Sequence, residues 1–128
     1  MKRLVATVLL LLLLVACKPP VDGESISGGL PEGTTAEFIL EAPARVGPVP
    51  VRLELSGTGE VEQVTITGDM THAGMIPVIR EAVEVEPGSW RAGDFEFHMG
   101  GDWFLLAEVS LADGTAFEVT LPVNVGGN

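Results

Sequence analysis

The feature that most constrains the fold is an alternation of apolar and polar side chains in short segments between residues 34 and 125. Successive side chains of a β-strand point to opposite faces, so this period gives each strand one apolar row. No segment keeps the 3.6-residue period of a helix. The apolar rows are Ala36, Phe38 and Leu40; Val49, Val51, Leu53 and Leu55; Val64 and Ile66; Val83 and Val85; Trp90, Phe95 and Phe97; Trp103, Leu105, Ala107, Val109 and Leu111; and Phe117, Val119, Leu121 and Val123.

Turn residues separate these rows, most clearly Pro87-Gly88 and Asp113-Gly114. About seven short strands in about ninety residues are typical of an antiparallel β-sandwich of immunoglobulin-like type. A segment of this length has room for one hydrophobic core. Residues 34–128 are therefore predicted to form a single all-β domain.

The first sixteen residues have the pattern of an export signal. Lys2 and Arg3 precede an apolar stretch over residues 4–15, which leads through Ala16 into Cys17. A helix over residues 4–16 would span only about 20 Å, short of the roughly 30 Å hydrocarbon core of a bilayer. Lys18-Pro19-Pro20 would also end it. The stretch is therefore predicted to be a signal peptide, not a membrane span.

The four residues that end at Cys17 resemble the bacterial lipobox. That resemblance implies cleavage before Cys17 and a lipid on its sulfur, so the partner would be membrane lipid and the location the cell envelope, outside the cytoplasmic membrane or in the periplasm. The alternative is an ordinary secretory signal with a chance cysteine. Residues 18–33 are rich in Pro, Gly, Ser and acid, which is typical of a flexible tether. The predicted organisation is a signal at 1–16, a lipidated cysteine and tether at 17–33, and the domain at 34–128.

The charge and the missing motifs exclude several functions. Loss of Lys2 and Arg3 with the signal would take the formal net charge from −11 to about −13, a field that repels phosphate backbones and excludes nucleic acid as a partner. There is no phosphate-binding loop, nucleophile elbow or His-Glu-x-x-His motif, so no enzymatic activity is predicted. Cys17 is the only cysteine, and lipidation would leave no thiol for a disulfide or a metal.

All the methionines and histidines after the signal lie in two short windows. Residues 69–75 contain Met70, His72 and Met75, and residues 97–103 contain His98 and Met99. Thioether sulfur and imidazole nitrogen are donors that suit Cu(I). The five side chains are therefore candidate copper ligands.

Packing offers a second explanation for the methionines, because this residue often fills gaps in a core. Met70 continues the row of Val64 and Ile66 and could be the last buried residue of its strand. On an ideal strand Met99 would point inward and His98 outward. Both could face one ion only if the strand ended there, which Gly100-Gly101 permits.

Several stretches together resemble the YtkA-like domain family, which is related to FixH. They are Met-x-His-x-Gly-Met at residues 70–75, Gly-x-Trp at 88–90, Phe-x-Met-x-Gly-x-Trp at 97–103, and Gly-Pro-Val-Pro-Val at 47–51. The resemblance covers most of residues 34–125. It implies an immunoglobulin-like sandwich outside the cytoplasmic membrane that takes part in copper handling and cytochrome oxidase assembly. Met70, His72 and Met75 match the family's Met/His-rich loop and Met99 its strand methionine, but Thr71 and Ala73 stand where members often have Pro, Met or His.

The sequence thus predicts a membrane-tethered module that holds Cu(I) and passes it to a membrane protein such as an oxidase subunit. The alternative is a non-catalytic adaptor that binds no metal and uses the Met/His loop as an apolar contact.

Overall fold

The computed structural model describes residues 29–71 and 75–126, and over these residues the chain forms β-strands and no helix. It follows that these residues contain no helix long and apolar enough to cross a membrane. The strands are β1 (Thr35–Leu40), β2 (Gly47–Pro48), β3 (Val51–Ser56), β4 (Val61–Met70), β5 (Val78–Glu81), β6 (Val83–Glu86), β7 (Ser89–Ala92), β8 (Glu96–Phe97), β9 (Gly101–Leu111) and β10 (Ala116–Val125).

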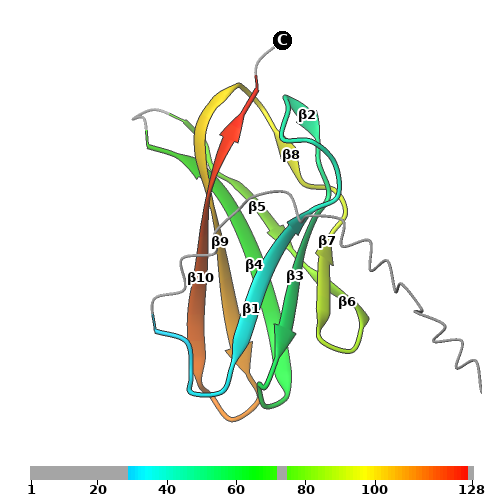
Figure 1. Cartoon of the computed structure of the whole chain (residues 1–128), viewed down its shortest axis with the longest axis vertical. Helices are drawn as coiled ribbons and strands as arrows, with labels where there is room; N and C mark the ends of the chain where they lie inside the picture. The colour runs from blue at the N-terminus through cyan, green and yellow to red at the C-terminus, as the bar shows by residue number, and fades with distance from the viewer. Residues whose placement is uncertain (1–28, 72–74, 127–128) are drawn as a thin grey trace, which may run out of the picture.

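Two four-stranded sheets pack face to face to form a sandwich (Figure 1). The first has the order β1-β3-β7-β6 and the second β10-β9-β4-β5, while β2 and β8 form a separate pair. Neighbouring strands run antiparallel, and the chain changes sheets between β3 and β4, β5 and β6, and β7 and β9. This is the Greek-key order of immunoglobulin-like sandwiches.

The predicted all-β antiparallel sandwich is confirmed, although the expected count of about seven strands is too low. Residues 78–86 divide into β5 and β6, which lie in different sheets, and the pair β2–β8 adds two strands of two residues each. An apolar alternation over so few residues cannot reveal such short strands, because their pairing depends on distant segments.

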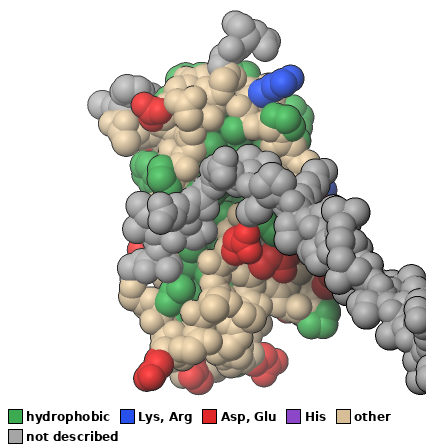
Figure 2. Space-filling view, viewed as in Figure 1, with side chains coloured by type: hydrophobic (Ala, Val, Ile, Leu, Met, Phe, Trp, Pro, Cys, Tyr) green, Lys and Arg blue, Asp and Glu red, His purple; other side chains and the backbone are tan. Residues whose placement is uncertain are grey.

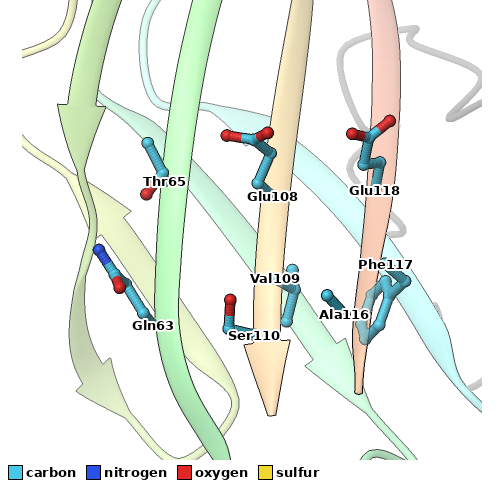
Figure 3. A pocket seen from close by; sticks show the side chains of 8 residues that line it. All are labelled: Gln63, Thr65, Glu108, Val109, Ser110, Ala116, Phe117 and Glu118. Atoms are coloured by element: carbon cyan, nitrogen blue, oxygen red, sulfur yellow. The ribbon is translucent and has the colours of Figure 1, made fainter. Parts of the chain in front are cut away.

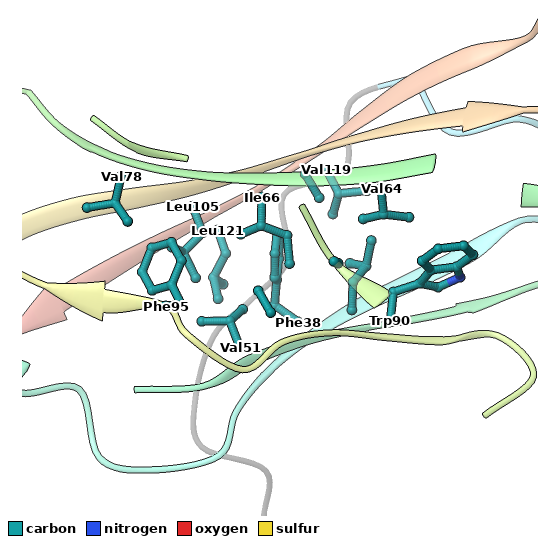
Figure 4. Close-up of a cluster of buried hydrophobic side chains, with 14 of the residues drawn as sticks. Phe38, Val51, Val64, Ile66, Val78, Trp90, Phe95, Leu105, Val119 and Leu121 are labelled. Atoms are coloured by element: carbon teal, nitrogen blue, oxygen red, sulfur yellow. The ribbon is translucent and has the colours of Figure 1, made fainter. Parts of the chain in front are cut away.

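The core lies between the two sheets and consists mainly of the predicted apolar rows (Figure 4). Ile66 and Leu105 of the second sheet point toward Val51 of the first, and all three are fully buried. Burial of each side chain of this size stabilises the fold by about 1.5–3 kcal/mol. The long adjacent strands β4, β9 and β10 therefore form a well-packed sheet, and the connecting loops lie at its two ends.

One predicted row does not face the core. Val83 and Val85 of β6 are 65% and 49% exposed. Val83 is paired with Arg91 on the outer face, whereas Glu84 is paired with the buried Trp90. A β-bulge follows Glu84. β6 is an edge strand of its sheet and all four of its side chains are exposed, so the alternation on this strand does not mark a buried row.

Both predicted turns are present. Gly88 connects β6 to β7 with φ of 81°, and Gly114 connects β9 to β10 with φ of 90°, a region that glycine enters without steric cost. Asp113 Oδ1 accepts a hydrogen bond from the Thr115 backbone N–H at 2.8 Å, and this bond holds the pKa of Asp113 below its ordinary value. The local sequence thus fixes the ends of these hairpins.

An ion-pair cluster crosses the outer face of the first sheet. Glu41 Oε1 lies 3.0 Å from Arg52 Nη2, and Glu41 Oε2 lies 2.6 Å from Arg91 Nε. Partial burial opposes ionisation of Glu41, but the two guanidinium groups outweigh it and hold the pKa of Glu41 below its ordinary value of 4.5. Elsewhere acidic side chains predominate, and on the face shown in Figure 2 they lie near both ends and in the middle of the molecule.

Candidate functional site

The two Met/His windows meet at one end of the sandwich. Met70 ends β4 directly opposite Trp103 of β9, while Phe97 ends β8, four residues before β9 begins. Figure 1 shows the end of β4 and the start of β9 together at the upper end of the molecule. We call the residues that connect β4 to β5 and β8 to β9 (71–77 and 98–100) the Met/His end.

Met70 is packed inside this end. Its side chain is 5% exposed, and its Cε lies 2.7 Å from the position that a Cβ on Gly101 would occupy. Gly101 itself has φ of 133°, where side chains are rarely found. The interpretation of Met70 as the last buried residue of its strand is confirmed, and its thioether could reach an ion only by leaving this packing.

His98 and Met99 lie outside the core on the turn between β8 and β9. Both are about half exposed: the side chain of His98 is 48% accessible and Met99 is 48% exposed. The alternative in which the strand ends before Gly100-Gly101 is the one found: β8 ends at Phe97 and the chain bends over the next three residues, so Met99 does not continue the inward row of an ideal strand. His98 Nδ1 lies 3.8 Å from Glu96 Oε1.

Trp103 anchors this turn. Its apolar row predicted a buried position but not its contact with the turn. The Trp103 Nε1–H donates a hydrogen bond of 2.9 Å to the backbone carbonyl of Met99. The indole ring also packs edge-on against Phe97, with 5.0 Å between ring centroids and 76° between planes. The sequence signal was the Gly100-Gly101 pair followed by a tryptophan, since two glycines permit the tight return that this contact needs.

The other candidates belong to the β4–β5 connection. Met75 is partly buried and packs against the core, while the next residue, Ile76, is 82% exposed. His72 lies outside the described residues, as does Cys17 with the whole predicted signal peptide. The structure therefore brings Met70 and the His98–Met99 turn to one end and places Met75 on the adjoining connection.

The donors at this end suit a soft ion better than a hard one. Within residues 29–71 and 75–126, no three His, Cys, Asp or Glu side chains are grouped so that they could hold a metal ion. The accessible donors are the imidazole of His98 and the thioether of Met99, with Met75 partly accessible. Thioether and imidazole are ligands that suit Cu(I), so the donor set fits copper in that state.

A groove of about 470 Å³ lies on the outer face of β4, β9 and β10, toward the other end of the sandwich (Figure 3). Glu108 and Glu118 stand directly opposite each other on β9 and β10, beside Thr65 of β4. Gln63 and Ser110 complete its polar lining. The like charges of Glu108 and Glu118 repel each other across the strand pair.

Comparisons of the chain with protein-family models, curated proteins and solved structures gave no match. The likeness to the YtkA-like family thus depends on the short motifs quoted above. The residues at the Met/His end are therefore the main structural observation that bears on function.

Proposed function

We propose that this chain is a non-catalytic, membrane-tethered copper-binding module outside the cytoplasm that holds Cu(I) through Met and His ligands for transfer. The observation that carries the proposal is the position of His98 and Met99, which are adjacent, half exposed and at the same end of the sandwich as Met70 and Met75. All the Met and His residues after the signal lie in the two windows that reach this end, and packing explains the buried Met70 but not the half-exposed His98 and Met99.

The chemistry of these donors favours transfer over storage. Thioethers are neutral, so Cu(I) keeps its positive charge and a partner with more or stronger donors can remove it by ligand exchange. Half-exposed ligands also leave the ion open to an approaching partner. In this proposal His98, Met99 and Met75 bind the ion together with His72, and Met70 supports the turn from beneath. The resemblance to the YtkA-like family suggests a membrane protein such as an oxidase subunit as the recipient.

The site is tested by anaerobic competition against a chromophoric Cu(I) chelator. The full chain should carry Cys17→Ser, because a free thiol would itself bind Cu(I), and should be purified in detergent. We expect one equivalent of Cu(I), and a loss of about tenfold or more in affinity for His98→Ala and for Met99→Leu, as for changes beside other metal sites. Met70→Leu is the matched control, since it removes a buried thioether and should leave the affinity nearly unchanged.

Two further comparisons sharpen this test. Zinc should bind more weakly than Cu(I), because thioethers suit it poorly. Binding should also weaken in acid, because a protonated imidazole cannot bind a metal. If the double variant His72→Ala/Met75→Leu binds as the parent does, the β4–β5 connection supplies no ligand and the site is confined to the turn at His98 and Met99.

The tether is a separate proposal that depends on Cys17. Cys17→Ser should abolish lipidation, so the exported protein should leave the membrane fraction or accumulate as an uncleaved precursor. Intact mass and fractionation of the cell envelope measure both outcomes. Unchanged mass and unchanged fractionation would contradict the anchor without affecting the copper site.

An adaptor that binds no metal is the second candidate. Three of the exposed large apolar residues, Val46, Ile76 and Met99, lie near the Met/His end, and such exposed apolar side chains favour a protein contact. Absence of Cu(I) binding by the parent chain would reject the copper module and favour this alternative.

A further inference from the structure

Trp103 holds the chain on both sides of His98. Its ring packs edge-on against Phe97, the residue before His98, and its Nε1–H donates to the carbonyl of Met99, the residue after. Trp103 is 2% exposed and is the first buried residue of the apolar row of β9, so its own position is fixed by the core. One buried side chain thus fixes the two residues that flank His98.

The rest of the turn has little to keep it in one shape. Gly100 and Gly101 follow Met99, and glycine loses more conformational freedom on ordering than any other residue. Gly101 has φ of 133°, and the methyl group of Met70 occupies the space where a side chain would stand. The contacts of Trp103 and Met70, together with the pairing of Gly101 with Val125 of β10, therefore order this glycine-rich segment, and Trp103 is the one that contacts Met99.

We infer that Trp103 is a positioning residue for a Cu(I) site at His98 and Met99, acting through the carbonyl of Met99. This inference rests on the copper-binding function proposed above. The hydrogen bond fixes the backbone of Met99 so that its thioether and the imidazole of His98 point outward together. Ligands that are ordered before the ion arrives bind it more tightly, because the cost of ordering them is already met by folding.

The chain contains a matched control in its second tryptophan. Trp90 is also buried, at 8% exposure, but among the described residues its Nε1 has no hydrogen-bond partner. It lies toward the other end of the core, beside Val64 and away from Val78 and Phe95 (Figure 4). Trp90→Phe therefore removes an indole N–H that orders no turn, whereas Trp103→Phe removes one that does.

The experiment compares the full chain with Trp103→Phe and Trp90→Phe, all carrying Cys17→Ser and studied in detergent. Cu(I) affinity is measured by anaerobic chelator competition at a temperature where each variant is folded. Trp103→Phe should bind about 3- to 10-fold more weakly than the parent, the equivalent of one net hydrogen bond, and Trp90→Phe should bind equally. In nuclear magnetic resonance spectra without metal, the backbone amides of His98 and Met99 should shift or broaden in Trp103→Phe alone.

The results separate failure of this inference from failure of the function. Parent-like affinity and unchanged His98 and Met99 amides in Trp103→Phe would overturn the positioning role while leaving copper binding intact. No Cu(I) uptake by the parent would overturn both. If Trp103→Phe does not fold, the indole N–H resonance of Trp103 in Trp90→Phe decides: it should move when Cu(I) binds, and a resonance that stays in place would overturn the inference.

Discussion

The two tryptophans lie toward opposite ends of one core and do different things there. Trp103 satisfies its indole N–H with the carbonyl of Met99, and it packs on Phe97. Trp90 leaves its indole N–H without a hydrogen bond among the described residues, beside an edge strand whose side chains are all exposed. A buried donor without a partner costs stability, so Trp90 contributes through apolar burial alone.

The loops at the two ends of the core differ in which contacts hold their shape. At the Trp90 end, Pro87-Gly88 forms the turn between β6 and β7, and the Gly88 carbonyl accepts a hydrogen bond of 2.7 Å from the backbone N–H of Leu55 in β3. At the Trp103 end, the turn from β8 to β9 has two glycines and is held by contacts from the core. A loop whose shape is held from the core in this way is suited to presenting ligands.

The largest expected effect on stability comes from removing the side chain of Trp103. Trp103→Ala should lower the free energy of unfolding by about 3–5 kcal/mol, because it empties a large buried site and leaves the carbonyl of Met99 without its donor. Trp90→Ala should cost less, since it removes no hydrogen bond and its site adjoins exposed β6. Urea denaturation followed by circular dichroism measures both. An equal loss in the two variants would mean that the hydrogen bond adds nothing to the fold.

The glycines at the two ends offer the next test. A Cβ on Gly88 would lie 2.5 Å from the backbone oxygen of Leu55, whereas one on Gly101 would lie 2.7 Å from the mobile Cε of Met70. Gly88→Ala should therefore destabilise by about 2–4 kcal/mol and Gly101→Ala by about 1–3 kcal/mol. Of the two, only Gly101→Ala should disturb the amide resonances of His98 and Met99. Disturbance of those amides by Gly88→Ala would show that the two ends are coupled.

Methionine variants separate packing from ligand binding within the Met/His end. Met70→Leu should cost under about 1.5 kcal/mol, because leucine nearly matches the buried volume of methionine. Met99→Leu should change the free energy of unfolding by no more than about 0.5 kcal/mol, because Met99 is half exposed. Yet Met99→Leu should weaken Cu(I) binding more than Met70→Leu does. The reverse order would assign Met70 as the ligand and contradict its packing role.

The smallest effect concerns the Glu41 cluster, which lies on neither Met/His turn and serves as a reference. Glu41→Gln should cost no more than about 1 kcal/mol at neutral pH. Because the folded pKa of Glu41 lies below its ordinary value, its stabilising effect is present above that value and is lost as the pH falls through the folded pKa. The difference in urea midpoint between parent and variant should therefore shrink in acid. A difference that does not change with pH would exclude ionisation of Glu41 as the cause.

The alternation of apolar and polar residues predicted most of the core, but it did not predict the exposure of the edge strand β6. The rows on β3, β4 and β9 are buried as expected, because each of these strands is paired on both sides and the facing sheet covers one of its faces. The row on the edge strand β10 is also buried except for Val123, since β10 pairs with β9 over its whole length. Val83 and Val85 have the same local pattern but lie on an edge strand with a bulge, where no second sheet covers them. Local periodicity therefore identified the strand but not that all of its side chains are exposed.

The sequence by itself determined the all-β class, the turns at Pro87-Gly88 and Asp113-Gly114, and the grouping of Met and His residues into two windows. Each of these depends on residue type and near neighbours, which a linear chain already contains. Only the tertiary structure decided that Met70 is buried while Met99 is exposed, and that Trp103 reaches the Met99 carbonyl. These outcomes depend on where β8 ends and on the register of β4 against β9, which the pairing of distant strands sets.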